Sequence, residues 1–421
     1  MIEKYYSGVI EQIYNRIGKE TRNIVMANYS NDFSIENLEV IRRYQSNEDN
    51  VFFAYSEFSY NTLVGAYEPF LDIICNMHRR FIGGSFDDFQ KECGVYYLHR
   101  QVLNSYYETG ECFREETVLL NEVAYEQRRM TMAIADMLKK LSEVKPLMIV
   151  INRFQMASKS SIETIKYLID NPCANIGIVL GVNAIVKGTD STVEVWDRIV
   201  ESLEDRSAIY YIGSAGPLKN NVKTTNDDEL YITMNFEQSI QEASNIMEFL
   251  DFEQARRGCR IIEHKLKFED AWIDEKSLRR FYMVYARTSV LLGEMSKAIE
   301  LTNEYKALIP ENDSEHYLSL YYFMKGTCYM YQGKLEKAGN SAKSAYDYAV
   351  LAEDDTLIFK AELLSVMIKM SGWYNIFFCV QDIPVSDEII EKLIKHGYRN
   401  HLAHIYIYAY DNSRDVVKQS F

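Results

Sequence analysis

The sequence has little of several residues that define protein classes. It has 6 prolines in 421 residues, well below the usual share of roughly 5%, and this scarcity favours a helix-rich chain. Its 7 cysteines are scattered, odd in number and without a C-x-x-C pair, which is typical of a reducing compartment rather than of a disulfide framework. No apolar run approaches the ~18 residues of a membrane span, and the amino terminus lacks the apolar core of a signal peptide. We therefore expect a soluble, cytoplasmic protein with no membrane partner.

Positive charge is also scarce relative to negative charge. The chain has 46 Lys and Arg against 61 Asp and Glu, which gives a formal net charge of −15. Affinity for phosphate backbones and anionic lipid surfaces comes from clustered Lys and Arg, so we expect no direct nucleic-acid partner. Tyrosine, by contrast, is abundant at 32 residues, and large half-polar side chains suit helix packing and interaction surfaces.

Residues 1–215 alternate between two kinds of segment. Short apolar runs typical of buried strands occur at 23–27, 51–55, 147–151, 176–182 and 208–212. Apolar residues with helical spacing occur at 2–17, 35–44, 67–81 and 116–144, and after the capping residues 158–161. Strands that alternate with helices predict right-handed crossovers and a parallel sheet. Residues 82–112 fit neither pattern.

Beyond about residue 236 the pattern is helical and repeats. Gly293, Gly333 and Gly372 are spaced by 40 and 39 residues, and an alanine follows each of the first two by five residues. This period predicts an array of helical hairpins. Small residues are expected where the helices touch, at Ala286, Ala298, Gly326, Ala338 and Ala345. We therefore divide the chain into an α/β domain at 1–215, a linker with connecting helices at 216–276, and helical repeats at 277–421.

Two stretches resemble one family. P-L-M-I-V-I-N-R-F-Q-M-A-S-K-S-S-I at 146–162 is similar to the Walker-B strand and following segment of the STAND branch of AAA+-like NTPases, and Tyr67-Glu68-Pro69-Phe70 is similar to the family's Y-x-P helix. In that branch, which includes the maltose-activator-type bacterial regulators, an NTPase core precedes tetratricopeptide-like repeats. The resemblance covers roughly 1–215 and 277–375. It implies a P-loop-NTPase-like parallel sheet domain followed by an all-α tetratricopeptide-like repeat domain.

The chain departs from this family where nucleotide would be held. After the first strand the family places G-x-x-x-x-G-K-[ST], whose amides and lysine hold phosphates; this chain has N-Y-S-N-D-F-S-I at 28–35. The acidic pair that holds Mg²⁺ is replaced by Asn152 and Arg153. Losing both elements removes most of the electrostatic stabilisation of phosphoryl transfer, so we expect no enzyme activity and no cofactor. The residues of this degenerate nucleotide pocket are Asn28, Asp32, Ser34, Asn152 and Arg153.

Arg153 has two interpretations. Its guanidinium could replace the metal charge beside a nucleotide, or it could be solvated or paired with a local carboxylate, which we favour. Glu57 and Asp72 are the nearest approach to a catalytic acid pair, and no spacing links them.

The histidines near the carboxyl end also have two interpretations. His401 and His404 are spaced i, i+3 on a predicted helix, with His396 and Cys379 nearby in sequence, a spacing compatible with a metal. Histidines on helix surfaces are much commoner, and we expect no metal site.

The repeats are the better candidate for function. On the tetratricopeptide template, the first helix of each hairpin lines a concave surface, and stacked repeats commonly bind partners there. The side chains that would line this groove are Arg280, Arg287, Phe323, Thr327, Glu362 and Lys369. The alternative is a solvated helical face.

The sequence therefore predicts a non-catalytic cytoplasmic signalling or regulatory protein. It would act through protein–protein interaction, binding another protein or a peptide through the repeats, with self-association also open. Two alternatives remain. One is a nucleotide-binding STAND-type switch with an atypical pocket, and the other is the sensory portion of a longer transcription regulator or cyclase.

Overall fold

The computed structural model describes residues 2–29, 38–46, 50–59, 63–114, 116, 118, 120–183, 186–187, 193–212, 223–224, 235–268, 273–312, 314–375 and 387–406. The chain forms two compact units. The first comprises Met1–Arg114 and Asn121–Ala271, and the second comprises Glu115–Leu120 and Trp272–Phe421. The first unit contains a parallel sheet with helices and the second is helical, so the coarse prediction of an α/β domain and a helical domain is confirmed.

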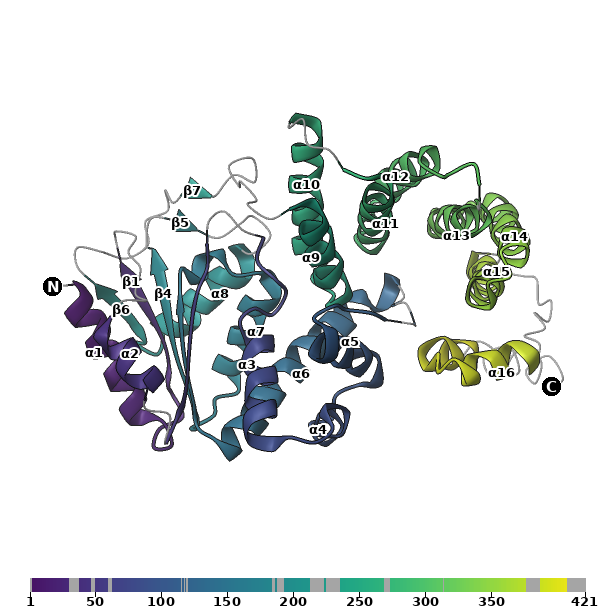
Figure 1. Ribbon diagram of the computed structural model, residues 1–421. Helices are drawn as coiled ribbons and strands as arrows, with labels where there is room; N and C mark the ends of the chain where they lie inside the picture. The colour runs from purple at the N-terminus through teal and green to yellow at the C-terminus, as the bar shows by residue number, and fades with distance from the viewer. Residues whose placement is uncertain are drawn as a thin grey trace. The chain divides into compact units, whose positions relative to one another are not determined.

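The first unit is built on a five-stranded parallel sheet (Figure 1). Its strands, in the spatial order β2-β3-β4-β1-β6, are β2 (Phe52–Glu57), β3 (Leu147–Asn152), β4 (Ile176–Asn183), β1 (Ile24–Tyr29) and β6 (Ile209–Ile212). Every residue of β3 and β4 is buried, as expected for parallel strands covered on both faces. All five predicted strands are therefore present. A separate short pair joins β5 (Val186–Lys187) to β7 (Lys223–Thr224).

Helices cover both faces of the sheet. In Figure 1, α1 (Ile2–Arg16) and α2 (Glu39–Ser46) lie on one face, and α7 (Lys159–Asp170) and α8 (Val193–Glu204) lie on the other, with α3 (Phe70–Met77) and α6 (Val123–Val144) beyond them. The apolar residues of α1 at i, i+4 and i+7, Tyr6, Ile10 and Ile13, are fully buried against the sheet, as its amphipathic pattern predicts.

Residues 82–112, for which no prediction could be made, contain two helices, α4 (Phe86–Glu92) and α5 (Tyr97–Thr109). The helix predicted at 67–81 begins only at Phe70, after a cis Glu68–Pro69 bond, and widens into a π-helical turn at His78–Ile82. The helix predicted from residue 116 begins at Val123, because residues 115–120 belong to the second unit. Ser158 caps α7 as predicted, its hydroxyl accepting from the Ser161 N–H.

Two further helices, α9 (Phe236–Glu248) and α10 (Phe252–Phe268), fall within 216–276, the region assigned to a linker and connecting helices, and belong to the first unit. The turn between them is tied to the start of α7. The Asp251 carboxylate accepts from the Ser160 N–H at 2.9 Å, and Lys159 forms an ion pair with Glu253 at 2.9 Å. The Gln254 amide donates to the Val64 carbonyl at 2.9 Å.

The second unit consists of antiparallel helical hairpins. Its helices are α11 (Glu275–Leu291), α12 (Met295–Ala307), α13 (Glu315–Tyr331), α14 (Leu335–Leu351), α15 (Asp355–Asn375) and α16 (Asp387–Lys395), with a further helical stretch at 399–406. Gly293 and Gly333 lie at the α11–α12 and α13–α14 turns with φ of +78° and +71°, a conformation that suits glycine. The third predicted turn glycine is wrong, because α15 continues through Gly372; Glu353, with φ of +52°, occupies the turn before α15 instead.

The small residues that the repeat pattern places between helices are buried. Gly326 shows why size matters: an added Cβ would lie 3.0 Å from Leu364 Cδ2 on α15 and 3.3 Å from Ser341 Cβ on α14. Ala286, Ala298, Ala338 and Ala345 are at most 1% exposed. Close approach of the helices therefore depends on these positions.

Across the part of the chain that the structure describes, no helix has both the length and the apolar character needed to cross a membrane.

Candidate functional site

The carboxyl ends of the strands are where ligands bind in open parallel sheets. In this chain β1 ends at Asn28 and Tyr29, β2 at Glu57, β3 at Asn152 and β4 at Asn183. We call this end of the sheet the carboxyl edge. Four of its five residues have amide or carboxylate side chains, and the fifth is a tyrosine. What it can bind depends on whether these groups face solvent or one another.

On the face covered by α1, the carboxyl edge is closed by packing between side chains. Tyr29 on β1 donates its hydroxyl to Asn152 Oδ1 on β3 at 2.6 Å, a fully buried contact that passes over the intervening strand β4. It can form because β4 carries Gly181 at this level, and the Tyr6 hydroxyl of α1 fills the same space. Asn152, which replaces an acidic residue of the resembled family, is therefore a packed core residue here.

Arg153 follows β3 and is paired with a carboxylate. Its Nη1 lies 3.0 Å from Glu57 Oε1 at the end of β2 and donates to the Phe58 carbonyl at 3.3 Å. Both side chains are mostly buried, and Glu57 also accepts from the Tyr55 hydroxyl. The expectation that Arg153 pairs with a local carboxylate is confirmed, and this pairing reduces its capacity to hold an anion.

Asn28 points the other way. Successive residues of a strand face opposite sides, so Asn28 lies on the sheet face opposite Tyr29 and Asn152, and the structure does not bring Asn28 and Asn152 together. Its side chain is fully buried, and neither amide atom has a hydrogen-bond partner among the residues that the structure describes, which is rare for buried polar groups. Asp32 and Ser34, the other predicted pocket residues, lie outside the described residues.

Sequence reasoning missed three contributors to this edge. The sequence pattern places Tyr29 in the polar stretch after the first strand, and Glu57 enters only as one half of an unsupported acid pair. Gln155 sits in a short 3₁₀ turn (Phe154–Met156) and accepts from the Asn183 N–H at 3.3 Å. The local signal for Gln155 in the sequence is a polar amide flanked by Phe154 and Met156, three residues after an apolar strand.

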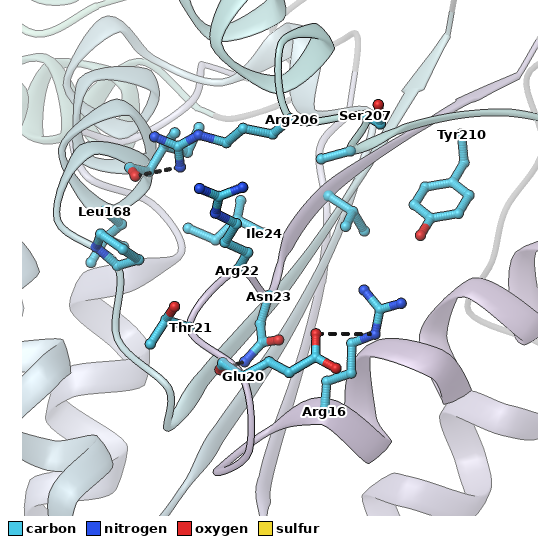
Figure 2. A pocket seen from close by; sticks show the side chains of 14 residues that line it. Arg16, Glu20, Thr21, Arg22, Asn23, Ile24, Leu168, Arg206, Ser207 and Tyr210 are labelled. Carbon is cyan, nitrogen blue, oxygen red and sulfur yellow. Dashed lines mark hydrogen bonds and ion pairs between the residues drawn. The ribbon is translucent and has the colours of Figure 1, made fainter.

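A cavity of about 210 Å³ lies at the opposite, amino end of β1 and β6 (Figure 2). Three arginines from different segments line it: Arg16 at the end of α1, Arg22 before β1, and Arg206 after α8. Arg206 donates to the Ile169 carbonyl in the last turn of α7 at 2.7 Å, and Arg16 lies 3.6 Å from Glu20. Arg206 therefore satisfies a carbonyl at a helix carboxyl end, and Arg16 is paired with a carboxylate.

Arg22 is the remaining cation of this cavity. It is exposed and forms no ion pair with a described residue. One screened guanidinium beside the negative ends of α1, α7 and α8 gives little preference for an anion. We therefore assign this cavity no ligand.

A second cavity, of about 240 Å³, gathers three carboxylates: Glu68 and Asp72 around the start of α3, and Glu242 on α9. Glu68 accepts from the Gly65 N–H at 2.9 Å, and Asp72 accepts from the Tyr106 hydroxyl at 3.1 Å. Glu57 and Asp72 are therefore engaged separately, and do not form an acid pair. Burial, with the charges of Glu68 and Asp72, raises the pKa of Glu242 to about 7.

The six predicted groove side chains are carried by the first helix of each predicted hairpin, α11, α13 and α15: Arg280, Arg287, Phe323, Thr327, Glu362 and Lys369. Arg280 and Lys369 are exposed, and Arg287 is half-buried. Solvent, and therefore a partner, can reach all three of these basic side chains.

The other three groove positions have contacts within the unit. Phe323 packs against a cluster formed by α13, α14 and α15, and Thr327 donates its hydroxyl to the Phe323 carbonyl at 2.9 Å. Glu362 forms an ion pair with Lys392 of α16 at 2.7 Å. Phe323 and Glu362 therefore contact neighbouring helices, and Thr327 is hydrogen-bonded within its own helix.

The histidines considered as metal ligands have other partners. His401 is 3% exposed and contacts Glu116, while the His396 ring stacks on Phe359 with centroids 4.6 Å apart. Cys379 lies outside the described residues. Among the residues that are described, no three or more His, Cys, Asp and Glu side chains gather into a group that could hold a metal ion.

We predict that Gly181→Ala destabilises the first unit. The added Cβ would overlap the Tyr6 hydroxyl and lie 2.8 Å from Asn152 Oδ1, and overpacking of this kind lowers the free energy of unfolding by about 1–3 kcal/mol. Gly339→Ala is the matched control, because Gly339 is exposed within α14 and an added Cβ there meets nothing within 4 Å; it should raise stability by roughly 0.5–1 kcal/mol. Urea denaturation measures both. A Gly181→Ala chain as stable as wild type would contradict the packing described.

We predict that stability falls as pH rises through Glu242. This carboxyl has an ordinary pKa of 4.5 that rises to about 7 in the folded chain, so between these pH values the folded state binds more protons than the unfolded state. The free energy of unfolding then decreases with rising pH, by on the order of 2 kcal/mol from this group. Glu242→Gln should remove most of that slope between pH 5 and pH 8 in chemical denaturation. Exposed Glu201→Gln should retain it, and equal slopes in the two variants would refute the assignment.

Comparison with protein-family models and with curated proteins gives no match to this chain. The functional argument therefore depends on the geometry of the two units.

Proposed function

We propose that this chain is a non-catalytic, cytoplasmic regulatory protein that acts through protein–protein interaction. Its α/β unit would be a P-loop-NTPase-like scaffold that has lost its nucleotide chemistry, and its helical hairpins would be tetratricopeptide-like repeats that bind a protein or peptide. Switching would then come from a partner that binds one conformation better than another, rather than from hydrolysis.

One observation carries this proposal: the groups at the carboxyl edge bind one another. Asn152 accepts from Tyr29, and Arg153 pairs with Glu57. Phosphoryl transfer needs a metal bound by carboxylates and cations directed at phosphate. Here the arginine is neutralised by the carboxylate, and the residue before it is an amide in the core.

A nucleotide-binding switch is the second candidate, and Asn28 is the observation that favours it. This buried amide at the end of β1 has no hydrogen-bond partner among the described residues, and a ligand could supply one. Asn28→Leu separates the two: without a ligand, removing an unsatisfied buried polar group should be neutral or stabilising.

We predict that saturating Mg²⁺–ATP leaves the melting temperature of the wild-type chain unchanged and that phosphate release stays at the buffer rate. A ligand well above its Kd would stabilise the folded state by a few kcal/mol. A clear shift lost in Asn28→Leu would support the second candidate. ATP turnover that is abolished in Arg153→Ala but retained in exposed Arg198→Ala would overturn the proposal.

We predict that partners contact the first helices of the hairpins. A photo-crosslinking residue placed at Lys369 on α15, or at Arg280 on α11, should yield specific adducts in the native cell. The same residue at Lys343, which is also exposed but lies on the second helix α14, should yield far fewer. Adducts of equal yield at Lys369 and Lys343 would exclude the groove as the binding surface.

A further inference from the structure

A six-residue segment of the first half of the chain is part of the second unit. We call Glu115–Leu120 the strap. Immediately before it, the Arg114 guanidinium donates to the Glu248 carbonyl of the first unit at 2.7 Å, and α6 of the first unit begins soon after it, at Val123. The chain therefore leaves the first unit, contributes six residues to the helical unit, and returns.

The strap is bound through a buried carboxylate. Glu116 is fully buried, and its Oε1 accepts from the His401 backbone N–H at 2.9 Å and lies 2.8 Å from His401 Nδ1. Removing a carboxylate from water is strongly unfavourable unless it is paired and hydrogen-bonded. Both of these contacts come from one residue of the 399–406 helix, so the second unit holds this carboxylate at a defined position.

Two further positions of the strap are also engaged. Val118 is 7% exposed, and the Leu120 N–H donates to the Tyr331 hydroxyl at the end of α13 at 3.3 Å. The Tyr398 ring contacts the His401 ring in a tilted arrangement, with centroids 5.7 Å apart. Tyr398 also belongs to an apolar cluster formed with α15, α16 and the 399–406 helix. The strap is thus held by a carboxylate, an apolar side chain and a main-chain donor at alternate residues, a combination typical of peptide recognition.

We propose that the surface around His401 and Tyr331 is a peptide-binding site, and that the strap occupies it as an internal ligand. Its external ligand is a protein segment with the strap's pattern, a glutamate followed at alternate positions by aliphatic residues, which binds when the strap is displaced. The inference rests on the proposed role in protein–protein interaction and specifies the partner's chemistry and the regulation.

Competition from the strap sets the expected size of the effect. A segment tethered within the same chain has an effective concentration on the order of 1 mM. A free peptide with micromolar intrinsic affinity would then bind the wild-type chain up to roughly 10³-fold more weakly than a chain whose strap is released. Only a partner whose concentration or affinity is high enough to displace the strap would therefore bind.

The test is fluorescence anisotropy with a labelled peptide of residues 113–123, F-R-E-E-T-V-L-L-N-E-V, and full-length protein. We expect weak binding to wild type and at least tenfold tighter binding to Glu116→Ala, whose strap has lost its carboxylate. Adding His401→Ala to that chain should abolish binding. Alanine in place of the peptide's glutamate at position 116 should also abolish it. Glu111→Ala, an exposed change before the strap, is the matched control and should behave as wild type.

Val118→Thr, a milder and nearly isosteric weakening of the strap, provides a second route if Glu116→Ala does not fold by circular dichroism. It should tighten peptide binding severalfold. Peptide affinity that is unchanged in the folded strap variants would overturn the proposal. So would a peptide with alanine at position 116 that binds as tightly as the original peptide. Either result would leave the strap a purely structural element. If such a result came with photo-crosslinked adducts at Lys369, it would refute only this inference. Tight peptide binding without those adducts would instead refute partner binding by the first helices of the hairpins and retain the strap site.

Discussion

The contact between Tyr29 and Asn152 over Gly181 is the constraint on which the first unit depends. A parallel sheet offers its carboxyl edge to ligands because loops diverge there and leave a crevice. In this chain the absence of one side chain on β4 lets the neighbouring strands join above it, and the Tyr6 hydroxyl of α1 completes the packing. Arg153 is also held by Glu57, so contacts among the edge's own residues stabilise it.

The second unit contains a buried carboxylate, Glu116, that is held by contacts with a single residue, His401. Glu116 has no place in an apolar interior unless His401 receives it, so this pair makes the seating of the strap specific as well as stable. The proposed function includes no hydrolysis, and under it a segment that competes with a partner for one site would change the populated conformation through binding alone. The two units thus fit one account of regulation without turnover.

Local signals in the sequence predicted most of the fold. Five apolar runs became the five strands, Ser158 caps α7, and Gly293 and Gly333 form hairpin turns, because each depends on residues close in sequence. The turn predicted at Gly372 is wrong because a glycine can also lie inside a helix, here α15. The turn before α15 is made instead by Glu353, in the left-handed conformation that favours glycine. The candidate sites were less predictable: Asn152 and Arg153 were identified as substitutions, but their partners Tyr29 and Glu57, and the pairing of Glu116 with His401 across 285 positions, arise only from tertiary packing.

The central claim is that the carboxyl edge is filled by its own side chains, and a crystal structure grown in saturating Mg²⁺–ATP tests it most directly. The account predicts that Tyr29 remains hydrogen-bonded to Asn152 and Arg153 remains paired with Glu57, with no triphosphate at the ends of β1 and β3. An ordered triphosphate at that edge, with Arg153 separated from Glu57 and directed at a phosphate, would contradict it.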